Sequence, residues 1–247
     1  MNQPTFSHVP YPSDYMDIAV KKVKNYFKNN FKNVKVLDMP AGNGWIGEQL
    51  TTCGMNVTSA DINEDKPHFS QVDMEKSLPF LDEEFDAIIC CEGIEHVFSP
   101  FELFTEFSRI LKKGGILIIT TPNIQNLYSR WQFLCSGYLF QFDPFDQIPL
   151  KDNMVGDKGH ISHVSYGQLR YYTEHFEMKV ESPTGGRMKR IVLLPLLFPF
   201  LIIGFWWNYR DWKKMSGDSH QKEIIKHLFN IRVLLSRSLV FIATKPK

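Results

Sequence analysis

The sequence predicts an α/β protein built on a doubly wound, mostly parallel sheet. Short apolar runs at about residues 34–38, 57–61, 69–72, 85–91 and 116–121 alternate with helical patterns at about 44–53 and 100–111. This alternation is typical of strand–helix–strand units, which place parallel strands side by side beneath helices. The first run leads through a loop with two glycines into an amphipathic segment, as expected where a nucleotide-binding strand turns into its helix.

The remaining elements complete a sheet of seven strands. Residues 14–30 carry apolar side chains at helical spacing, and Ser13 or Asp14 can cap this helix before the first strand. Pro100 stands where the first turn of a helix accepts proline. The runs 176–181 and 239–244 are expected to be the closing strands.

Composition restricts the class of protein. With 247 residues and 43% apolar residues, the chain suits one domain with an insertion. The net charge of +1 makes nucleic acid an unlikely partner. The four cysteines show no Cys-x-x-Cys spacing, and no basic-then-apolar run opens the sequence, so we expect a cytoplasmic protein.

The charges around the glycine loop indicate the kind of ligand. Asp38 ends the first strand, and Pro40 stands where a nicotinamide-binding fingerprint would have a glycine. An acid here would repel a pyrophosphate but suits a cationic ligand. Asp61, 23 residues after Asp38, can accept hydrogen bonds from ribose hydroxyls. S-adenosylmethionine, which has an ammonium, a sulfonium and no phosphate, therefore fits better than NAD.

Residues 15–182 and the last strand resemble the class I S-adenosylmethionine-dependent methyltransferases. The similarity rests on the loop after Val36, on Asp61, on Gln71-Val72-Asp73-Met74, on the strand 85–91 and on Leu111-Lys112-Lys113-Gly114-Gly115. It implies a Rossmann-like methyltransferase fold whose last strand is antiparallel. It also implies these cofactor-binding residues: Asp38, Pro40, Ala41, Gly42, Gly44, Asp61, Ile62, Asp73, Met74 and Cys91. Among them, Asp38 would face the methionine part, Asp61 the ribose and Asp73 the adenine.

A possible reacting site follows the fourth strand directly. Glu92-Gly93-Ile94-Glu95-His96 can bring two carboxylates and a histidine together within one helical turn, and His160 and His163 occur downstream. Two carboxylates and two histidines can hold Mg²⁺ or another divalent metal. Without a metal, His96 can act as a general base, and a purely structural role is the third alternative.

The Glu-x-x-Glu-His motif, Thr121-Pro122-Asn123 and a later His-Val also resemble the subgroup that contains ubiquinone-biosynthesis O-methyltransferases and small-RNA 2′-O-methyltransferases. Resemblance to the latter implies a metal held by this motif and a distal histidine, a place that His163 fits better than His160. Glu92, Glu95, His96 and His163 are thus the predicted catalytic and metal-binding residues.

An apolar insertion precedes the last strand. Ile191 to Trp207 contains no charged residue, Arg187, Lys189 and Arg190 precede it, and Pro195 and Pro199 are expected to interrupt its helix. The domain prediction is a core at 1–186 with a lid at about 122–172, an apolar and basic insertion at 187–232, and a closing strand within 233–247. The insertion is expected to contact the inner membrane face without crossing it; a buried cap, a homodimer face and a true span are the alternatives.

Together these features predict a methyltransferase that uses S-adenosylmethionine, acting on oxygen of a small or lipid-linked acceptor such as a quinone precursor or a glycan. A non-catalytic methyltransferase-like binding protein is the alternative, and a nicotinamide-dependent oxidoreductase is a weaker one.

Overall fold

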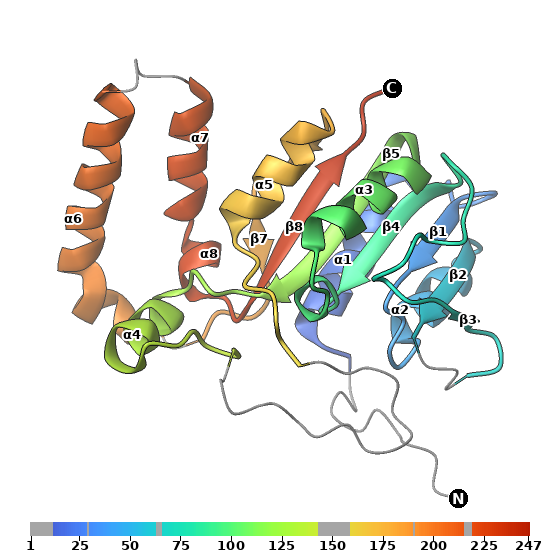
Figure 1. The fold of residues 1–247 in the computed structure, drawn as a ribbon, viewed down its shortest axis with the longest axis horizontal. Coiled ribbons are helices and arrows are strands. Elements are labelled where there is room, and N and C mark those ends of the chain that lie inside the picture. Colours follow the sequence, from blue (N-terminus) through green and yellow to red (C-terminus); the bar gives the residue numbers. More distant parts are fainter. Residues whose placement is uncertain (1–11, 29, 63–65, 143–158, 190, 215–218) are drawn as a thin grey trace, which may run out of the picture.

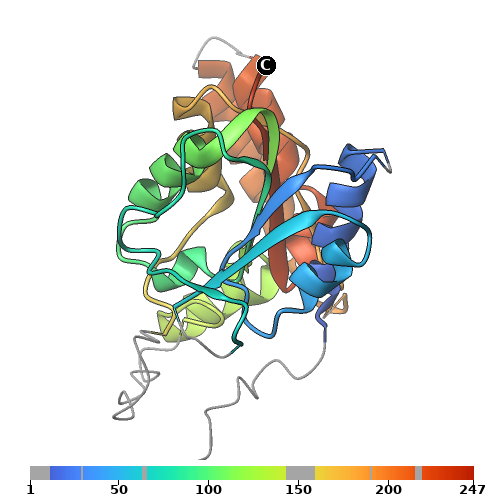
Figure 2. The same ribbon diagram turned by 90° about the vertical axis from the view of Figure 1, so that its right-hand side faces the viewer.

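The protein is a three-layer sandwich of helices on both faces of one sheet (Figures 1 and 2). Figure 1 presents a computed structural model that describes residues 12–28, 30–62, 66–142, 159–189, 191–214 and 219–247. The strands are β1 Lys35–Asp38, β2 Asn56–Asp61, β3 Ser70–Gln71, β4 Phe85–Cys91, β5 Leu111–Pro122, β6 Lys179–Val180, β7 Thr184–Gly185 and β8 Ser238–Thr244. The helices are α1 Asp14–Tyr26, α2 Trp45–Thr51, η1 Ile94–His96, α3 Pro100–Ile110, α4 Leu127–Ser136, α5 Tyr166–His175, α6 Leu193–Lys214, α7 Ser219–Leu228 and α8 Ile231–Leu235.

The strand order is β3-β2-β1-β4-β5-β8-β6, and β7 also pairs with β8. β1 to β5 are parallel, whereas β8 is antiparallel to β5, β6 and β7. The predicted doubly wound, mostly parallel fold is therefore confirmed. The sheet has eight strands in the described residues, not seven, because two short strands occupy its last edge. The expected strand at 176–181 shrinks to two residues, since Phe176 ends α5 and Glu177 has a positive φ.

Alternate residues of the strands supply two apolar layers. On one face α3 and α5 cover the sheet, with Leu103, Phe104, Phe107, Tyr166 and Leu169 packed on Leu37, Ile88, Leu117 and Phe241. On the other face α1 and α2 cover it, with Ala19, Val23, Ile46 and Leu50 packed on Val36, Ile89, Ile118 and Ile242. Strands buried on both faces explain why the sequence shows continuous apolar runs and not alternation.

The insertion forms a helical hairpin beside the sheet. In Figure 1, α6 and α7 stand side by side, beyond α5 and away from the strands. α6 is one continuous helix, so the expected interruption by proline is wrong. Pro195 lies in the first turn, where backbone N–H groups have no helical partner, and Pro199 removes one hydrogen bond without ending the helix. By length and composition, α6 could span a membrane.

Candidate active site

Three predicted segments meet at one edge of the sheet. β1 lies between β2 and β4, and the chain passes from β1 to the β2 side but returns to the β4 side. Open α/β sheets bind ligands at such a switch point, beyond the carboxyl ends of the strands. Asp38, Asp61 and Glu92 stand at or directly after the ends of these three strands.

The glycine loop is tied to β2 by its backbone. The Gly42 N–H donates to Asp61 Oδ2 at 2.9 Å, and the Ala41 N–H donates to the Ala60 carbonyl at 2.8 Å. Gly42 has a φ of +50°, and a Cβ there would meet no atom within 4 Å. The loop therefore presents open space beside Asp61, as a close-lying ligand requires.

Gly44 has a different task from Gly42. It caps α2 with a φ of +77°, and a Cβ at this position would lie 2.7 Å from Lys66 Nζ and 3.1 Å from Phe69 Cζ. Lys66 Nζ in turn donates to the Asn43 carbonyl at 2.6 Å. Gly44 thus makes the turn and the close packing of residues 66–69 possible.

Asp38 lies beneath the loop. Its side chain is fully buried, and Oδ2 accepts a hydrogen bond from the Gly47 N–H at 3.1 Å. Burial raises the pKa of Asp38 well above its ordinary value, and the nearby charge of Asp61 raises it further. Asp38 Oδ2 therefore positions α2, while Oδ1 has no hydrogen-bond partner among the described residues, so contact of Asp38 with the methionine part of the cofactor stays a prediction.

Pro40 connects the glycine loop to the loop after β4. A Cβ on Gly93 would lie 2.3 Å from Pro40 Cδ and 2.8 Å from Pro40 Cγ. The proline ring therefore packs directly on the Gly93 backbone, and only glycine fits there. Pro40, which departs from the usual glycine of this motif, is matched by a glycine on the facing loop.

The other predicted cofactor residues lie along the same edge. Asp73 follows β3, accepts from the Glu75 N–H at 3.0 Å and pairs with Lys76 Nζ at 3.2 Å. Met74 packs against the core, Ile62 follows Asp61 at the end of β2, and Cys91 is buried at the end of β4.

Glu92 is held by the neighbouring strand. With a φ of +48°, it donates its N–H to the Thr120 carbonyl at 3.0 Å and accepts from the Thr120 hydroxyl at 3.1 Å. Burial raises the pKa of Glu92, while the Thr120 hydroxyl and the charge of Arg237 lower it.

Glu95 is a fully buried carboxyl whose pKa burial raises and the Thr121 hydroxyl lowers. Its side chain is 0% exposed, and neither carboxylate oxygen has a hydrogen-bond partner among the residues that the structure describes. Burial raises the pKa of Glu95 well above its ordinary value, and the negative charge of Glu92 adds to this shift. Since native proteins pair almost all their buried polar groups, an unpaired carboxyl at a sheet edge indicates a functional site.

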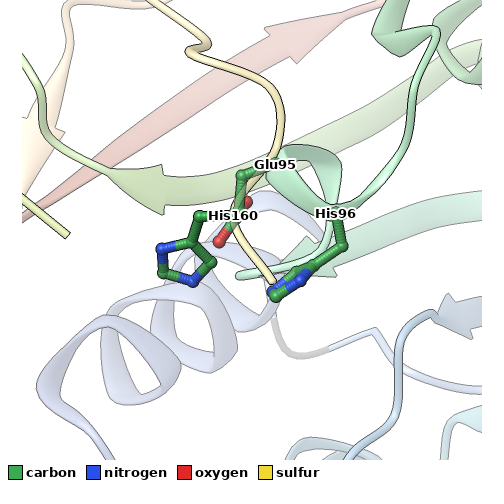
Figure 3. A group of neighbouring side chains, drawn as sticks. All are labelled: Glu95, His96 and His160. Atoms are coloured by element: carbon green, nitrogen blue, oxygen red, sulfur yellow. The ribbon is translucent and has the colours of Figure 1, made fainter. Parts of the chain in front are cut away.

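Figure 3 shows Glu95 pointing between the rings of His96 and His160. The potential ligand atoms of these three residues all lie within 4.8 Å of one another, and the two ring centroids are 4.9 Å apart. His160 Nδ1 lies 2.6 Å from the Gln141 carbonyl, which fixes the ring. We call Glu95, His96 and His160 the Glu–His cluster.

His160 takes the place in this cluster that the sequence assigned to His163. The Ile161 and Ser162 N–H groups donate to the backbone carbonyl of Glu95 at 3.0 and 2.9 Å. These bonds hold His160, the residue before them, next to Glu95. His163 instead packs its ring on Phe142, with centroids 4.5 Å apart. Glu92, also predicted as a metal ligand, is not one of the three grouped residues; it bonds to Thr120.

Two residues that interact electrostatically with Glu92 or Glu95 carried no local sequence signal. Tyr15, on α1, has its pKa raised by burial and by the charges of Glu92 and Glu95. Arg237 acts on Glu92 from the segment before β8. Only the fold brings these residues to the site. Thr120, by contrast, pairs with Cys91 across neighbouring strands, so the predicted strand order could have identified it.

The predicted lid is described only in part. α4 and the start of α5 belong to it, and Tyr128 packs on Phe140 with ring centroids 5.3 Å apart. Residues 143–158 of this segment lie outside the described residues. Arg190, which precedes the apolar insertion, also lies outside them. A lid function for this segment stays a prediction.

Comparison with known proteins agrees with this geometry. Residues 8–181 match the family model described as a methyltransferase domain. Two curated relatives are both named ubiquinone biosynthesis O-methyltransferase. The protein from Dechloromonas aromatica is 30% identical, with the match covering 44% of this chain and 53% of the relative. The protein from Dinoroseobacter shibae is 31% identical, with coverages of 38% and 44%. The chain thus matches about half the length of these relatives.

Solved structures show the same fold. A SAM-dependent methyltransferase from Archaeoglobus fulgidus superposes with a TM-score of 0.57 at 17% identity, covering 93% of this chain and 94% of the other. A 1,6-didemethyltoxoflavin-N1-methyltransferase from Burkholderia thailandensis, solved with bound S-adenosylhomocysteine, has a TM-score of 0.53 at 11% identity, covering 94% and 79%. At these identities the likeness concerns the fold.

Proposed function

This chain belongs to the methyltransferase-domain family, and from that premise we propose that it transfers a methyl group from S-adenosylmethionine to a hydroxyl of a small or lipid-linked acceptor. The observation that carries this proposal is the Glu–His cluster, which lies beside the loop of Asp61 and Gly42 at the switch point of the sheet.

The residues at this edge suit S-adenosylmethionine. Gly42 leaves open space over the loop, and a carboxylate accepts several hydrogen bonds, so Asp61 can hold the Gly42 N–H and the ribose hydroxyls together. Asp73 stands at the next strand end, where it can meet the adenine amino group. When bound, S-adenosylmethionine supplies a methyl group on a positively charged sulfur.

The Glu–His cluster can take the proton that an acceptor hydroxyl loses. When the hydroxyl oxygen bonds to the methyl carbon, the sulfur–methyl bond breaks and its electron pair stays on sulfur. The hydroxyl proton must then leave, and an imidazole of His96 or His160 can accept it, a role that general bases fill with gains of about 10²–10⁴ in rate. Holding the two reactants in line contributes further, by as much as about 7–11 kcal/mol.

The same cluster has the donor set for a divalent metal. One carboxylate and two imidazoles suit ions such as Mn²⁺ or Zn²⁺, with positions left for acceptor oxygens. A metal held there would lower the pKa of an acceptor hydroxyl and replace the general base. Activity that disappears after dialysis against EDTA and returns with added Mn²⁺ or Zn²⁺ would favour the metal; unchanged activity would favour the histidines.

A small cavity on the α6 side of the fold supports an amphiphilic acceptor. It has a volume of about 80 Å³ and lies between α4, α8 and the beginning of α6. Leu127, Phe140 and Leu193 give it apolar walls, whereas Lys189 and Arg237 give it positive charge. A cavity of this size holds only part of an acceptor, and its mixed walls suit a group that joins a polar or anionic head to an apolar tail.

Methyl-labelled S-adenosylmethionine tests the proposal. Purified protein is incubated with the labelled donor and a cell extract, and the products are divided between organic and aqueous phases. We expect label in the organic phase that disappears with Asp61→Ala and persists with Asp86→Ala. Asp86 is a matched control because it pairs with Lys112 at the opposite end of β4.

Each other outcome changes the proposal in a defined way. Label confined to the aqueous phase would replace the lipid-linked acceptor with a soluble one. No transfer, together with binding of S-adenosylhomocysteine in calorimetry, would favour the non-catalytic binding protein. No binding at all would overturn the proposed function.

A further inference from the structure

We propose that α6 binds the surface of an anionic lipid bilayer and lies in its interface without crossing it. Within α6, which the structure describes completely, only Leu197 is buried. Large apolar side chains are exposed along the whole helix, including Leu196, Phe198, Phe200, Ile202, Ile203, Phe205, Trp206 and Trp207. Phe200, for example, is 64% exposed. Soluble monomers rarely expose a continuous apolar surface of this kind, and it marks a binding face.

The two faces of α6 differ in what they contact. Leu193, Leu194, Leu197 and Leu201 pack toward the protein, on Leu127, Leu234 and Leu235. Further along, Phe205 contacts Phe229, with ring centroids 5.4 Å apart. The inner face is thus fixed to α4 and α8, which leaves the outer side chains for another surface.

The attachment of α7 argues against a membrane span. Arg170 on α5 binds Glu223 at 3.2 Å, and the Tyr166 hydroxyl lies 2.5 Å from His227 Nδ1. His220 at the start of α7 contacts Glu174 at 3.1 Å. α7 is therefore held to the core along its length, and α6 stands beside it (Figure 1).

A spanning α6 would carry these polar contacts into the hydrocarbon. Its 22 residues measure about 33 Å, enough to cross a bilayer core of about 30 Å. However, only four residues separate Lys214 from Ser219, so α7 and the ionic contacts of α5 would have to enter the membrane together with α6. Charged groups are strongly disfavoured in hydrocarbon, so the ion pairs of α5 and α7 keep α6 at the bilayer surface.

The positive charges around α6 favour an anionic bilayer as the surface that this face binds. From Arg187 to the end the chain has 12 Lys or Arg against 3 Asp or Glu. Lys189 precedes α6, and Arg210, Lys213 and Lys214 lie in its last turns. Cations close to an anionic leaflet are attracted to it and add to the binding of the apolar face. A second copy of α6 would bring the same positive charges to the contact, and like charges oppose such pairing.

Tryptophans at the same end agree with an interfacial position. The Arg210 guanidinium lies 5.6 Å and 5.4 Å from the ring centroids of Trp206 and Trp207, and Lys222 Nζ lies 5.7 Å from that of Trp212. Tryptophan with neighbouring cations is enriched at the level of lipid headgroups, where the ring is half in hydrocarbon and the charge meets phosphate.

Docking in this way brings the acceptor cavity to the membrane. Lys189 and Leu193, at the beginning of α6, line the cavity between α4, α6 and α8. A lipid-linked acceptor could therefore enter this cavity from the leaflet; this consequence rests on the proposed function, whereas membrane binding itself does not.

Vesicle co-sedimentation of the full chain tests the inference without any methyl donor. The probes are vesicles of pure phosphatidylcholine and vesicles with phosphatidylglycerol added. We expect binding to the anionic vesicles that weakens as salt is raised. The variant Leu196→Ser/Phe200→Ser/Ile203→Ser should weaken binding at least about 10-fold, because it removes apolar area from the outer face. The variant Lys213→Gln/Lys214→Gln should weaken it by about 10-fold or more at low salt.

A matched variant controls for general loss of surface apolarity. Leu81 and Tyr171 are exposed apolar residues outside the insertion, and Leu81→Ser/Tyr171→Ser should leave vesicle binding unchanged. Equal binding to neutral and anionic vesicles, or full binding by the α6 variant, would overturn the inference. A wild-type dimer that the α6 variant converts to monomer, with no vesicle binding, would assign the face to a second copy. Protein that resists carbonate extraction from membranes would indicate a span.

Discussion

The Glu–His cluster and the outer face of α6 are opposite exceptions to the same rule. Glu95 is a polar group buried without a hydrogen-bond partner in the described residues, and Phe200 belongs to an apolar surface left in solvent. Both arrangements are unfavourable in the described chain alone, since buried carboxyls need hydrogen bonds and apolar side chains need cover. The two proposals above supply what each lacks: an acceptor oxygen or a metal at Glu95, and a lipid surface at α6. In this protein, departures from ordinary packing mark the places of function.

The ordinary helices of the same protein make this contrast visible. α3 buries Leu103, Phe104, Phe107 and Ile110 on the sheet, whereas α6, twice as long, buries one side chain. Apolar content alone therefore does not tell which helix belongs to the core.

The largest expected effect compares one phenylalanine from each helix. Phe104→Ala removes a fully buried ring from the core and should lower the free energy of unfolding by about 3–5 kcal/mol. Phe200→Ala should change it by no more than about 0.5 kcal/mol, because the ring is exposed. Urea unfolding of both variants measures the difference. Equal losses of unfolding free energy would mean that Phe200 is buried against protein in solution. The outer face of α6 would then not be an exposed apolar surface.

A pair of histidine variants tests which histidine acts in the Glu–His cluster. His160→Gln should lower kcat about 100-fold, equivalent to about 2.7 kcal/mol, because it removes a member of the Glu–His cluster. His163→Gln should change kcat only a few-fold, since that ring packs on Phe142. Single-turnover methyl transfer measures both. A greater loss with His163→Gln would restore the sequence-based assignment.

The affinity for S-adenosylhomocysteine tests whether Asp61 binds the cofactor. Asp61→Ala should weaken binding of S-adenosylhomocysteine about 10- to 100-fold, because a hydrogen bond to a charged group contributes about 1.5–3 kcal/mol. Asp86→Ala should leave the dissociation constant unchanged. Isothermal titration calorimetry provides both values, and equal affinities for the two variants would place the cofactor elsewhere.

The smallest expected effect is a pH-dependent change in stability at Glu95. Its pKa is raised in the folded protein above the ordinary 4.5, so proton binding at Glu95 stabilises the fold fully below pH 4.5. This stabilisation is lost as the pH rises toward the folded pKa. Glu95→Gln has no proton to lose, so its stability relative to wild type should increase over this range, by at most about 1.4 kcal/mol per pH unit.

Urea unfolding at several pH values above 4.5 measures this slope for both proteins. Parallel pH profiles for wild type and Glu95→Gln would show that Glu95 is not the unpaired acid that its burial indicates.

The sequence by itself determined the family, the doubly wound sheet and the order of its motifs. These features depend on local periodicity and on residues at strand ends, such as Asp38, Asp61 and Glu92, whose positions follow from strands that run parallel. The predicted membership in the methyltransferases is confirmed. The apolar run at 191–207 was also visible, although its continuity as one helix was not.

Only the tertiary structure decided which side chains meet. It selected His160 over His163 because two backbone N–H groups bind the Glu95 carbonyl, and it brought Tyr15 and Arg237 to the site from distant segments. It buried Asp38 beneath its loop and placed Pro40 on Gly93. It also tied α7 to α5 through the ion pair of Arg170 and Glu223. Contacts between residues far apart in the chain depend on how complete elements pack, and no local pattern encodes that.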